Sequence, residues 1–191
     1  FEDQLSTVRQ TSDGGYILAG NSNSPISGNK ESSTATYGQV DGWVVRLDSE
    51  GNKIWEKSLG GSDNDKINDV RETSDGGFIV GGQIAIGSNY WLTRLDSDGG
   101  ILWQRVYKGS GLDNLQAVLP TADGGFLLGG MSYSGQGNDK DSSLHGGSDI
   151  WLMKVDSSGD KLWDKSFGGT LNETFAAIHP TTDGGYIVGG S

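Results

Sequence analysis

The chain has 191 residues, with 14 Lys and Arg against 25 Asp and Glu, which gives a formal charge of −11. Nucleic acids and anionic membrane surfaces are bound by patches of Lys and Arg, so this acidic balance argues against both partners. No apolar run approaches the roughly 18 residues of a membrane span, and we expect no membrane insertion. The lack of cysteine excludes disulfides, thiolate metal sites and cysteine nucleophiles.

Glycine is unusually frequent, at 33 residues, and an internal repeat organises much of it. The tetrapeptide Asp-Gly-Gly-aromatic occurs four times, starting at Asp13, Asp75, Asp123 and Asp183. A threonine stands two residues before each motif, and a short apolar run ending in glycine follows it. Asp and Gly tolerate the positive φ of tight turns, so each motif predicts a turn that leads into a strand.

The six tryptophans form a second repeated pattern, with partners 12 residues apart around a polar turn. The pairs are Trp43 and Trp55, Trp91 and Trp103, and Trp151 and Trp163. The Asp-Gly-Gly motifs themselves are 62, 48 and 60 residues apart. The two longer repeats carry their extra residues in one place, at 21–42 and 131–149.

The shortest repeat predicts four strands in chain order, at Ile67–Thr73, Phe78–Gln83, Tyr90–Leu95 and Ile101–Tyr107. Four antiparallel strands in 40 to 50 residues are typical of a β-propeller blade. We therefore predict an all-β propeller segment of about 3.5 four-stranded blades, at 1–61, 62–109, 110–168 and, in part, 169–191. The tryptophan pairs are interpreted as packing between blades.

Propellers typically contain four to eight blades, so this number does not close a ring. We expect the chain to be part of a longer protein, or its open ends to be covered by remaining blades or by another chain.

The repeat resembles a known family. Its segments 75–82 (Asp-Gly-Gly-Phe-Ile-Val-Gly-Gly) and 91–103 (Trp-Leu-Thr-Arg-Leu-Asp-Ser-Asp-Gly-Gly-Ile-Leu-Trp) are similar to repeats of secreted and cell-surface β-propeller proteins of the Bacteroidota, many of which use type IX secretion. Ser-Gly-Asn-Lys at 27–30 and the run from His145 to Asp156 resemble an insertion of that family. The resemblance implies a propeller and an extracellular or outer-surface location.

A more distant resemblance is to quinoprotein propellers, in which a glycine stands four residues before a tryptophan, as Gly51, Gly99 and Gly159 do here. Those enzymes use eight blades and vicinal cysteines, which this chain lacks. We therefore expect no organic cofactor. The one candidate ion is Ca²⁺.

The length variation of the repeats falls on loops at one face of the predicted disc, and binding often resides in such loops. The candidate ligand-binding residues in them are Asn29, Lys30, Tyr37, Tyr133, Asn138, Lys140 and His145. The alternative is that both loops are tolerated surface insertions.

An acidic residue stands ten positions before each motif aspartate: Asp3, Asp65, Asp113 and Glu173. If the first strand of each blade is innermost, these carboxylates form an arc near the central channel, and converging carboxylates suit Ca²⁺. In the alternative interpretation each carboxylate accepts backbone N–H groups and fixes its own loop.

Catalytic patterns are sparse, with two histidines, His145 and His179, and no pair of acids marked above the others. We predict a non-enzymatic extracellular or cell-surface module that binds a glycan or protein through the long loops. The alternatives are a segment of a polysaccharide-degrading enzyme whose catalytic residues lie outside this chain, and a structural spacer in a large surface protein.

Overall fold

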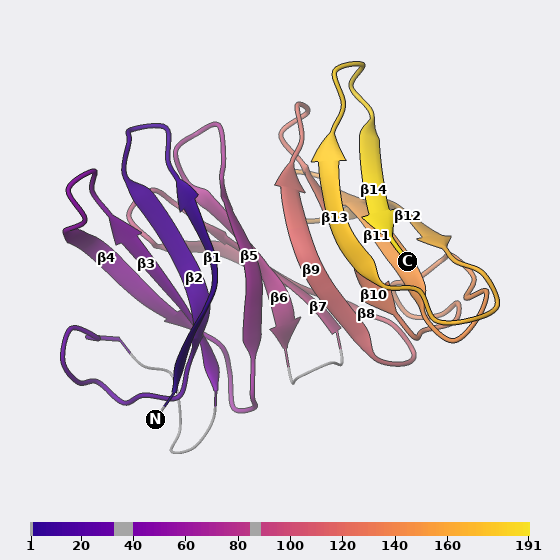
Figure 1. Ribbon diagram of the computed structural model, residues 1–191, viewed down its shortest axis with the longest axis horizontal. Helices are drawn as coiled ribbons and strands as arrows, with labels where there is room; N and C mark the ends of the chain where they lie inside the picture. The colour runs from indigo at the N-terminus through magenta and orange to yellow at the C-terminus, as the bar shows by residue number, and fades with distance from the viewer. Residues whose placement is uncertain (1, 33–39, 85–88) are drawn as a thin grey trace.

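The computed structural model describes residues 2–32, 40–84 and 89–191, which form 14 strands in four antiparallel sheets and contain no helix (Figure 1). The first sheet contains β1 (Asp3–Gln10), β2 (Tyr16–Ser22), β3 (Asp41–Leu47) and β4 (Lys53–Leu59). The second contains β5 (Lys66–Glu72), β6 (Phe78–Ile84), β7 (Asn89–Leu95) and β8 (Ile101–Lys108). The third contains β9 (Asp113–Pro120), β10 (Phe126–Ser132), β11 (Asp149–Val155) and β12 (Lys161–Phe167). The last has β13 (Phe175–Pro180) and β14 (Tyr186–Gly190).

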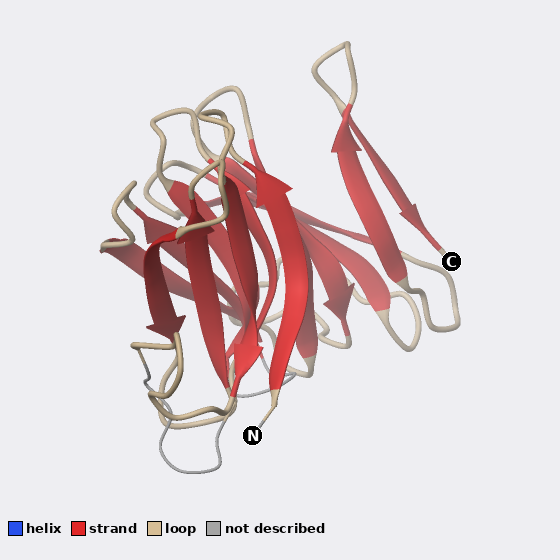
Figure 2. Cartoon of the chain, turned by 60° about the vertical axis from the view of Figure 1, so that its left-hand side comes forward, coloured by secondary structure: helices blue, strands red, loops and turns tan. Residues whose placement is uncertain are grey.

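Each sheet is a meander in which strands follow one another in chain order, as expected for a propeller blade. The first strands of successive sheets, β1, β5, β9 and β13, are neighbours, and the sheets fan out from them (Figures 1 and 2). The predicted all-β fold of about 3.5 blades is therefore confirmed. The four strands predicted for the second sheet begin and end within one residue of the observed ones.

Each second strand contains a glycine that faces a bulge in the first strand. The pairing of β5 with β6 shifts register between Ile67 and Asp69, opposite Gly82. A Cβ on Gly82 would overlap the main-chain carbonyl oxygen of Lys66. The same clash with a carbonyl in or just before the first strand would arise at Gly20, Gly130 and Gly190. These positions are glycine because the carbonyl at the bulge leaves no room for a side chain.

The Asp-Gly-Gly turns are built alike, and the threonine before each one has a structural role. In the second sheet Asp75 accepts hydrogen bonds from the Thr73 hydroxyl (2.6 Å) and the Gly77 amide (3.3 Å). Gly76 has φ +80°, which favours glycine. A cation from the third strand, Arg94, forms a bidentate ion pair with Asp75. Arg46 and Lys154 pair with Asp13 and Asp123 in the same way.

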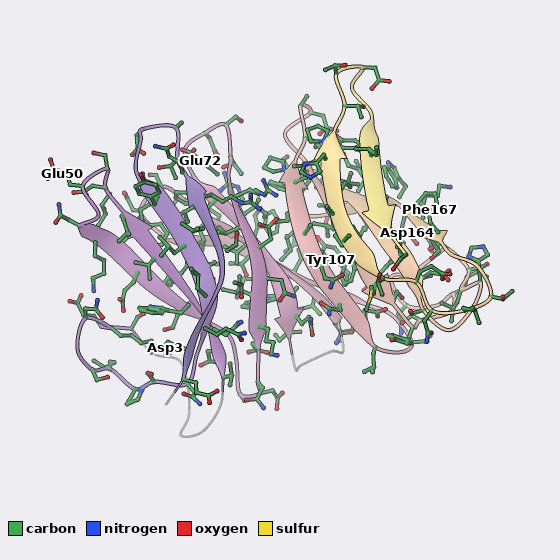
Figure 3. The ribbon with its side chains drawn as sticks, in the orientation of Figure 1. Asp3, Glu50, Glu72, Tyr107, Asp164 and Phe167 are labelled. Carbon is green, nitrogen blue, oxygen red and sulfur yellow. The ribbon has the colours of Figure 1, made fainter. Side chains whose placement is uncertain are left out.

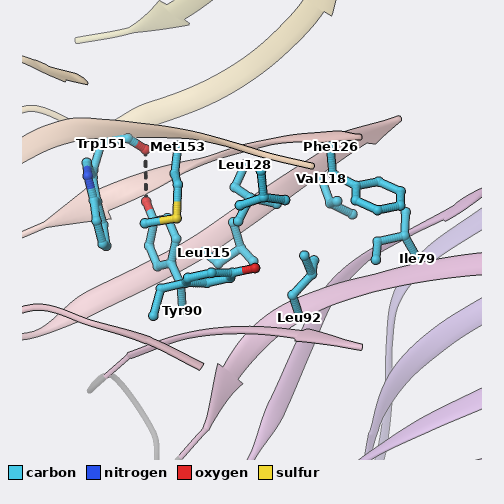
Figure 4. Packing of buried hydrophobic residues seen from close by; sticks show 11 residues of the cluster. Ile79, Tyr90, Leu92, Leu115, Val118, Phe126, Leu128, Trp151 and Met153 are labelled. Carbon is cyan, nitrogen blue, oxygen red and sulfur yellow. Dashed lines mark hydrogen bonds between the residues drawn. The ribbon is translucent and has the colours of Figure 1, made fainter. Parts of the chain in front are cut away.

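The hydrophobic core lies between neighbouring sheets. Tyr90 of β7 and Trp151 of β11 are buried with ring centroids 4.5 Å apart, and the Tyr90 hydroxyl donates to the Trp151 carbonyl at 3.0 Å (Figure 4). Trp103 contacts Phe126 of the next sheet edge to face. The tryptophans therefore join one blade to the next, as predicted from their spacing.

Gly82→Ala is expected to lower the free energy of unfolding by about 3 kcal/mol, because the added methyl group must displace the backbone of β5. Gly135→Ala is the control, since nothing lies within 4 Å of its Cβ position. We expect the control to remain within about 0.5 kcal/mol of the wild type. Urea denaturation measures both, and equal stability of the two variants would contradict the steric explanation.

Asp75→Asn is expected to destabilise the protein by about 1 kcal/mol at pH 7, a value kept small because the Asp75 carboxylate is largely solvent-exposed. The hydrogen bond from Thr73 and the ion pair with Arg94 lower the pKa of Asp75 to about 2. This stabilisation is complete above the ordinary carboxyl pKa and is lost as pH falls through about 2. The difference between wild type and variant should therefore shrink from pH 4 downward in urea denaturation. Asp63→Asn, at an exposed acid, is the control and should stay within about 0.5 kcal/mol of the wild type at pH 7.

Candidate functional site

The long loops and the blade-to-blade loops pack together on one face, opposite the Asp-Gly-Gly turns (Figure 1). In the third sheet the Tyr133 amide donates to the Leu112 carbonyl (2.9 Å), and Asn138 Nδ2 donates to the Gly109 carbonyl (2.9 Å). The Asp139 amide donates to the Lys108 carbonyl at 2.8 Å. The loop at 131–149 is therefore fastened to its neighbour, as the prediction of a shared face requires.

Both long loops contain the same buried lysine, in a Ser-x-Ser-x5-Lys pattern. Lys30 is 5% exposed, and its Nζ donates to Ser22 Oγ (2.9 Å) and the Ser24 carbonyl (2.8 Å). Its ammonium group lies 5.7 Å from the ring centroid of Trp43. The lysine therefore holds the loop against the third strand from inside.

Lys140 occupies the same repeat position in the third sheet, with different hydrogen-bond partners. It is 1% exposed and donates to the Ser142 carbonyl (2.8 Å) and Ser166 Oγ (2.6 Å), 5.9 Å from the ring centroid of Trp151. Burial lowers the pKa of this ammonium group. Its hydrogen-bonding capacity is used within the protein.

In the two long repeats, the acidic residue that follows the second tryptophan of the pair also holds the long loop in place. Glu56 accepts hydrogen bonds from the amides of Glu31 (2.5 Å) and Ser32 (2.6 Å). Asp164 accepts from the amides of Asp141 (3.1 Å) and Ser142 (3.0 Å). Burial opposes ionisation of Asp164, yet hydrogen bonds from Ser142 and Trp151 hold its pKa well below the usual range.

The short second repeat lacks this anchor. It has Gln104 in place of the acid, and Gln104 bonds to Thr93 of its own sheet instead. Two sequence features occur together in the long repeats and could have indicated the anchor. They are the Ser-x-Ser-x5-Lys pattern and the acid that follows the second tryptophan of each pair.

The structure corrects two of the predicted ligand contacts. Lys30 and Lys140 do not present their ammonium groups to solvent, because both are bonded inside their loops. Asn29, Tyr133, Asn138 and His145 are exposed on the loop face. Tyr37 lies outside the described residues. His145 Nδ1 is 2.8 Å from Asp149 Oδ2, so part of its polar capacity is used locally.

The four acids predicted as a calcium arc are held separately. Asp3 accepts hydrogen bonds from Ser22 Oγ (2.5 Å) and Ser24 Oγ (3.2 Å), and Asp113 accepts the equivalent bonds from Ser132 and Ser134. Asp65 and Glu173 accept the amides of Gly61 (2.6 Å) and Gly169 (2.9 Å). Asp3 lies on β1 in the first sheet (Figure 3), whereas Asp113 lies on β9 in the third. These contacts match the interpretation in which each acid fixes its own loop.

Among residues 2–32, 40–84 and 89–191, no group of three or more His, Asp or Glu side chains is arranged to hold a metal ion. A calcium ion shared by Asp3, Asp65, Asp113 and Glu173 is therefore not supported.

The inner strands line a polar cavity of about 260 Å³ that sequence analysis missed. Asp69 is buried there and accepts hydrogen bonds from Arg9 (3.2 Å), from Arg71 (3.2 Å) and from the Val118 amide (3.2 Å). His179 lines the same cavity from β13. One carboxylate thus ties the first three sheets together around the propeller axis. Arg9, Arg71 and His179 occupy the same position of the repeat, which was the available signal.

No family model matches the chain, and no curated protein matches it. Its fold is similar to the crystal structure of a protein of unknown function from Bacteroides caccae, with a TM-score of 0.57 and 11% identity, over 97% of this chain and 53% of that one. It is also similar to Sqt1 from Chaetomium thermophilum, with a TM-score of 0.52 and 13% identity, over 95% of this chain and 39% of that one. The chain thus spans about half or less of these structures, and the likeness shows the fold alone. The described residues form no helix that could cross a membrane.

Lys140→Met is expected to lower the free energy of unfolding by about 2–4 kcal/mol, because it removes two buried hydrogen bonds and one of the cations near Asp149 and Asp164. Proteolysis within 131–149 should become faster. Lys165→Met, at an exposed site on β12, should change stability by less than about 0.5 kcal/mol. A stable Lys140→Met variant that had lost binding to a ligand would contradict the anchoring role.

Proposed function

We propose that this propeller segment is a non-enzymatic binding or adhesion module that recognises a glycan or protein with its loop face. The observation that carries the proposal is the shared anchor of the two long loops. A buried lysine and an acid hold each loop on the rigid sheet, while Asn29, Tyr133 and Asn138 of the same loops are exposed. A rigid support lowers the conformational entropy lost on binding.

The chemistry of the exposed tips supports this proposal. Asn29 and Asn138 present amide groups that can donate and accept hydrogen bonds. Tyr133 is exposed, and its amide donates to the Leu112 carbonyl, so the loop face carries an aromatic ring as well as amide groups. Exposed amides and an exposed aromatic ring suit either the hydroxyl groups and apolar faces of a sugar or a mixed protein surface.

An extracellular or outer-surface location forms part of this proposal. It is supported by the resemblance of the repeats to secreted Bacteroidota propellers that use type IX secretion. The acidic charge supports a ligand other than nucleic acid.

Further blades or another chain are proposed to cover the two outer sheet faces. Leu5 of β1 is 59% exposed, whereas Leu115, at the same repeat position of an inner sheet, is 0% exposed. On the last sheet Ile187 is 61% exposed, whereas its counterpart Ile79 is buried. These faces carry the apolar residues that neighbouring blades cover elsewhere in the structure.

The decisive experiment is glycan-array and pull-down binding with tip variants. Asn29→Ala and Tyr133→Ala are each expected to weaken binding about tenfold or more, and the double variant further. These positions are chosen because Asn138 has a positive φ, so its replacement would also strain the backbone. Glu50→Ala, in an exposed turn of the other face, is the matched control and should bind like wild type (Figure 3).

Three results would contradict the proposal. Binding that survives the double variant would place recognition elsewhere, and a complete lack of ligands would favour the structural spacer. Turnover of a polysaccharide that depends on residues of this chain would identify an enzyme.

A further inference from the structure

Two acidic side chains meet at the junction between the third sheet and β13. Asp149, the first residue of β11, is 0% exposed, and Glu173 lies two residues before β13. The Glu173 amide donates to the Ser148 carbonyl (2.9 Å), which brings the two segments together. The junction therefore buries two carboxylates contributed by successive blades.

One oxygen of each carboxylate has hydrogen-bond donors. Asp149 Oδ2 accepts the His145 amide (3.0 Å) and lies 2.8 Å from His145 Nδ1. Glu173 Oε1 accepts the Gly169 amide (2.9 Å). The other oxygens, Asp149 Oδ1 and Glu173 Oε2, are buried and have no hydrogen-bond partner among the described residues.

These two oxygens point into the same space beside Gly168. A Cβ on Gly168 would lie 2.5 Å from Glu173 Oε2 and slightly nearer to Asp149 Oδ1. A side chain at this position would therefore fill the space between the oxygens, and glycine leaves it open. Oxygen atoms that converge around such a space are the arrangement that a hard cation needs, with Ca²⁺–O distances of about 2.3–2.6 Å.

The basic groups near this junction do not bond to these two oxygens. Lys140 donates to Ser142 and Ser166, and His145 Nδ1 contacts the other oxygen of Asp149, Oδ2. Two buried carboxylate oxygens that face each other without donors are costly unless a cation or a proton lies between them. We propose that Asp149 and Glu173 bind a Ca²⁺ ion that links the third blade to the next. Main-chain oxygens and water complete its coordination, since Ca²⁺ takes six to eight oxygens.

The first junction also brings two acids beside a glycine, but there Asp65 Oδ2 accepts the Gly61 amide (2.6 Å). Gly60 is flanked by Asp41 Oδ1 and Asp65 Oδ2, which lie 2.6 and 2.8 Å from its Cβ position. At the junction between the second and third sheets, Asn89 stands at the repeat position of Asp41 and Asp149. The other acid there, Asp113, accepts hydrogen bonds from the hydroxyl groups of Ser132 and Ser134. The acid pair thus accompanies the two long loops. This inference does not depend on the proposed binding function.

The test is calorimetric titration of EDTA-treated protein with CaCl₂, together with thermal unfolding at increasing CaCl₂. Wild type is expected to bind Ca²⁺ and to gain melting temperature with its concentration, because the ion binds the folded state. Asp149→Asn and Glu173→Gln should each reduce the Ca²⁺ bound by one per chain. Glu173→Gln provides the second variant because Glu173 is less buried than Asp149. Asp63→Asn, at an exposed acid, should bind like wild type.

Three results would overturn the proposal. Wild type that neither binds nor is stabilised by millimolar Ca²⁺ would exclude the site. Unchanged stoichiometry in both variants would place the ion elsewhere. Asp149→Asn that is more stable than wild type, without any effect of Ca²⁺ on either protein, would show that the two carboxylates share a proton instead.

Discussion

The burial of apolar side chains between successive sheets is the interaction on which the rest of the structure depends. A four-stranded sheet of this size cannot cover both of its own faces, and each core cluster draws on two neighbouring sheets. Tyr90 and Trp151 lie in one such layer, joined by ring contact and a hydrogen bond. Close approach of the sheets also demands small residues, as at Gly81, where a Cβ would press on Leu115 of the next sheet. Glycine content and tryptophan spacing are therefore two consequences of one packing requirement.

Much of the fold could be predicted because local chemistry and packing agree in every repeat. The Asp-Gly-Gly turn combines a positive φ at its first glycine with an aspartate that binds the preceding threonine, so its sequence and conformation are tightly linked. The first-strand bulge was not predictable, because it is visible only once Gly82 is seen against the Lys66 carbonyl. A glycine in a strand sequence can mark a bulge, a bend or a close approach of another backbone, and only the observed pairing register shows which of these applies.

The candidate site shows where sequence reasoning fails. A lysine in a polar loop was expected to face solvent, yet Lys30 and Lys140 are buried by hydrogen bonds to serines and by contact with a tryptophan of the third strand of the sheet. The role of Asp69 could not be predicted either, because its three hydrogen-bond donors come from three different sheets. Asn29 and Tyr133 were placed correctly, since their exposure follows from loop position alone. Prediction thus succeeded where a residue's environment is local and failed where it is assembled by the fold.

The anchors of the long loops and the acid pair at the following junction are physically connected. Lys140 lies within the electrostatic reach of both Asp149 and Asp164, and His145 joins the end of the loop to Asp149. A cation bound between Asp149 and Glu173 would neutralise the negative charge of Asp149, which otherwise attracts the ammonium group of Lys140. It would also fix the segment from His145 to Asp149, and with it one side of the loop face. Occupancy of the junction and rigidity of the exposed loop tip would then rise together, so that recognition and blade assembly depend on the same buried carboxylate.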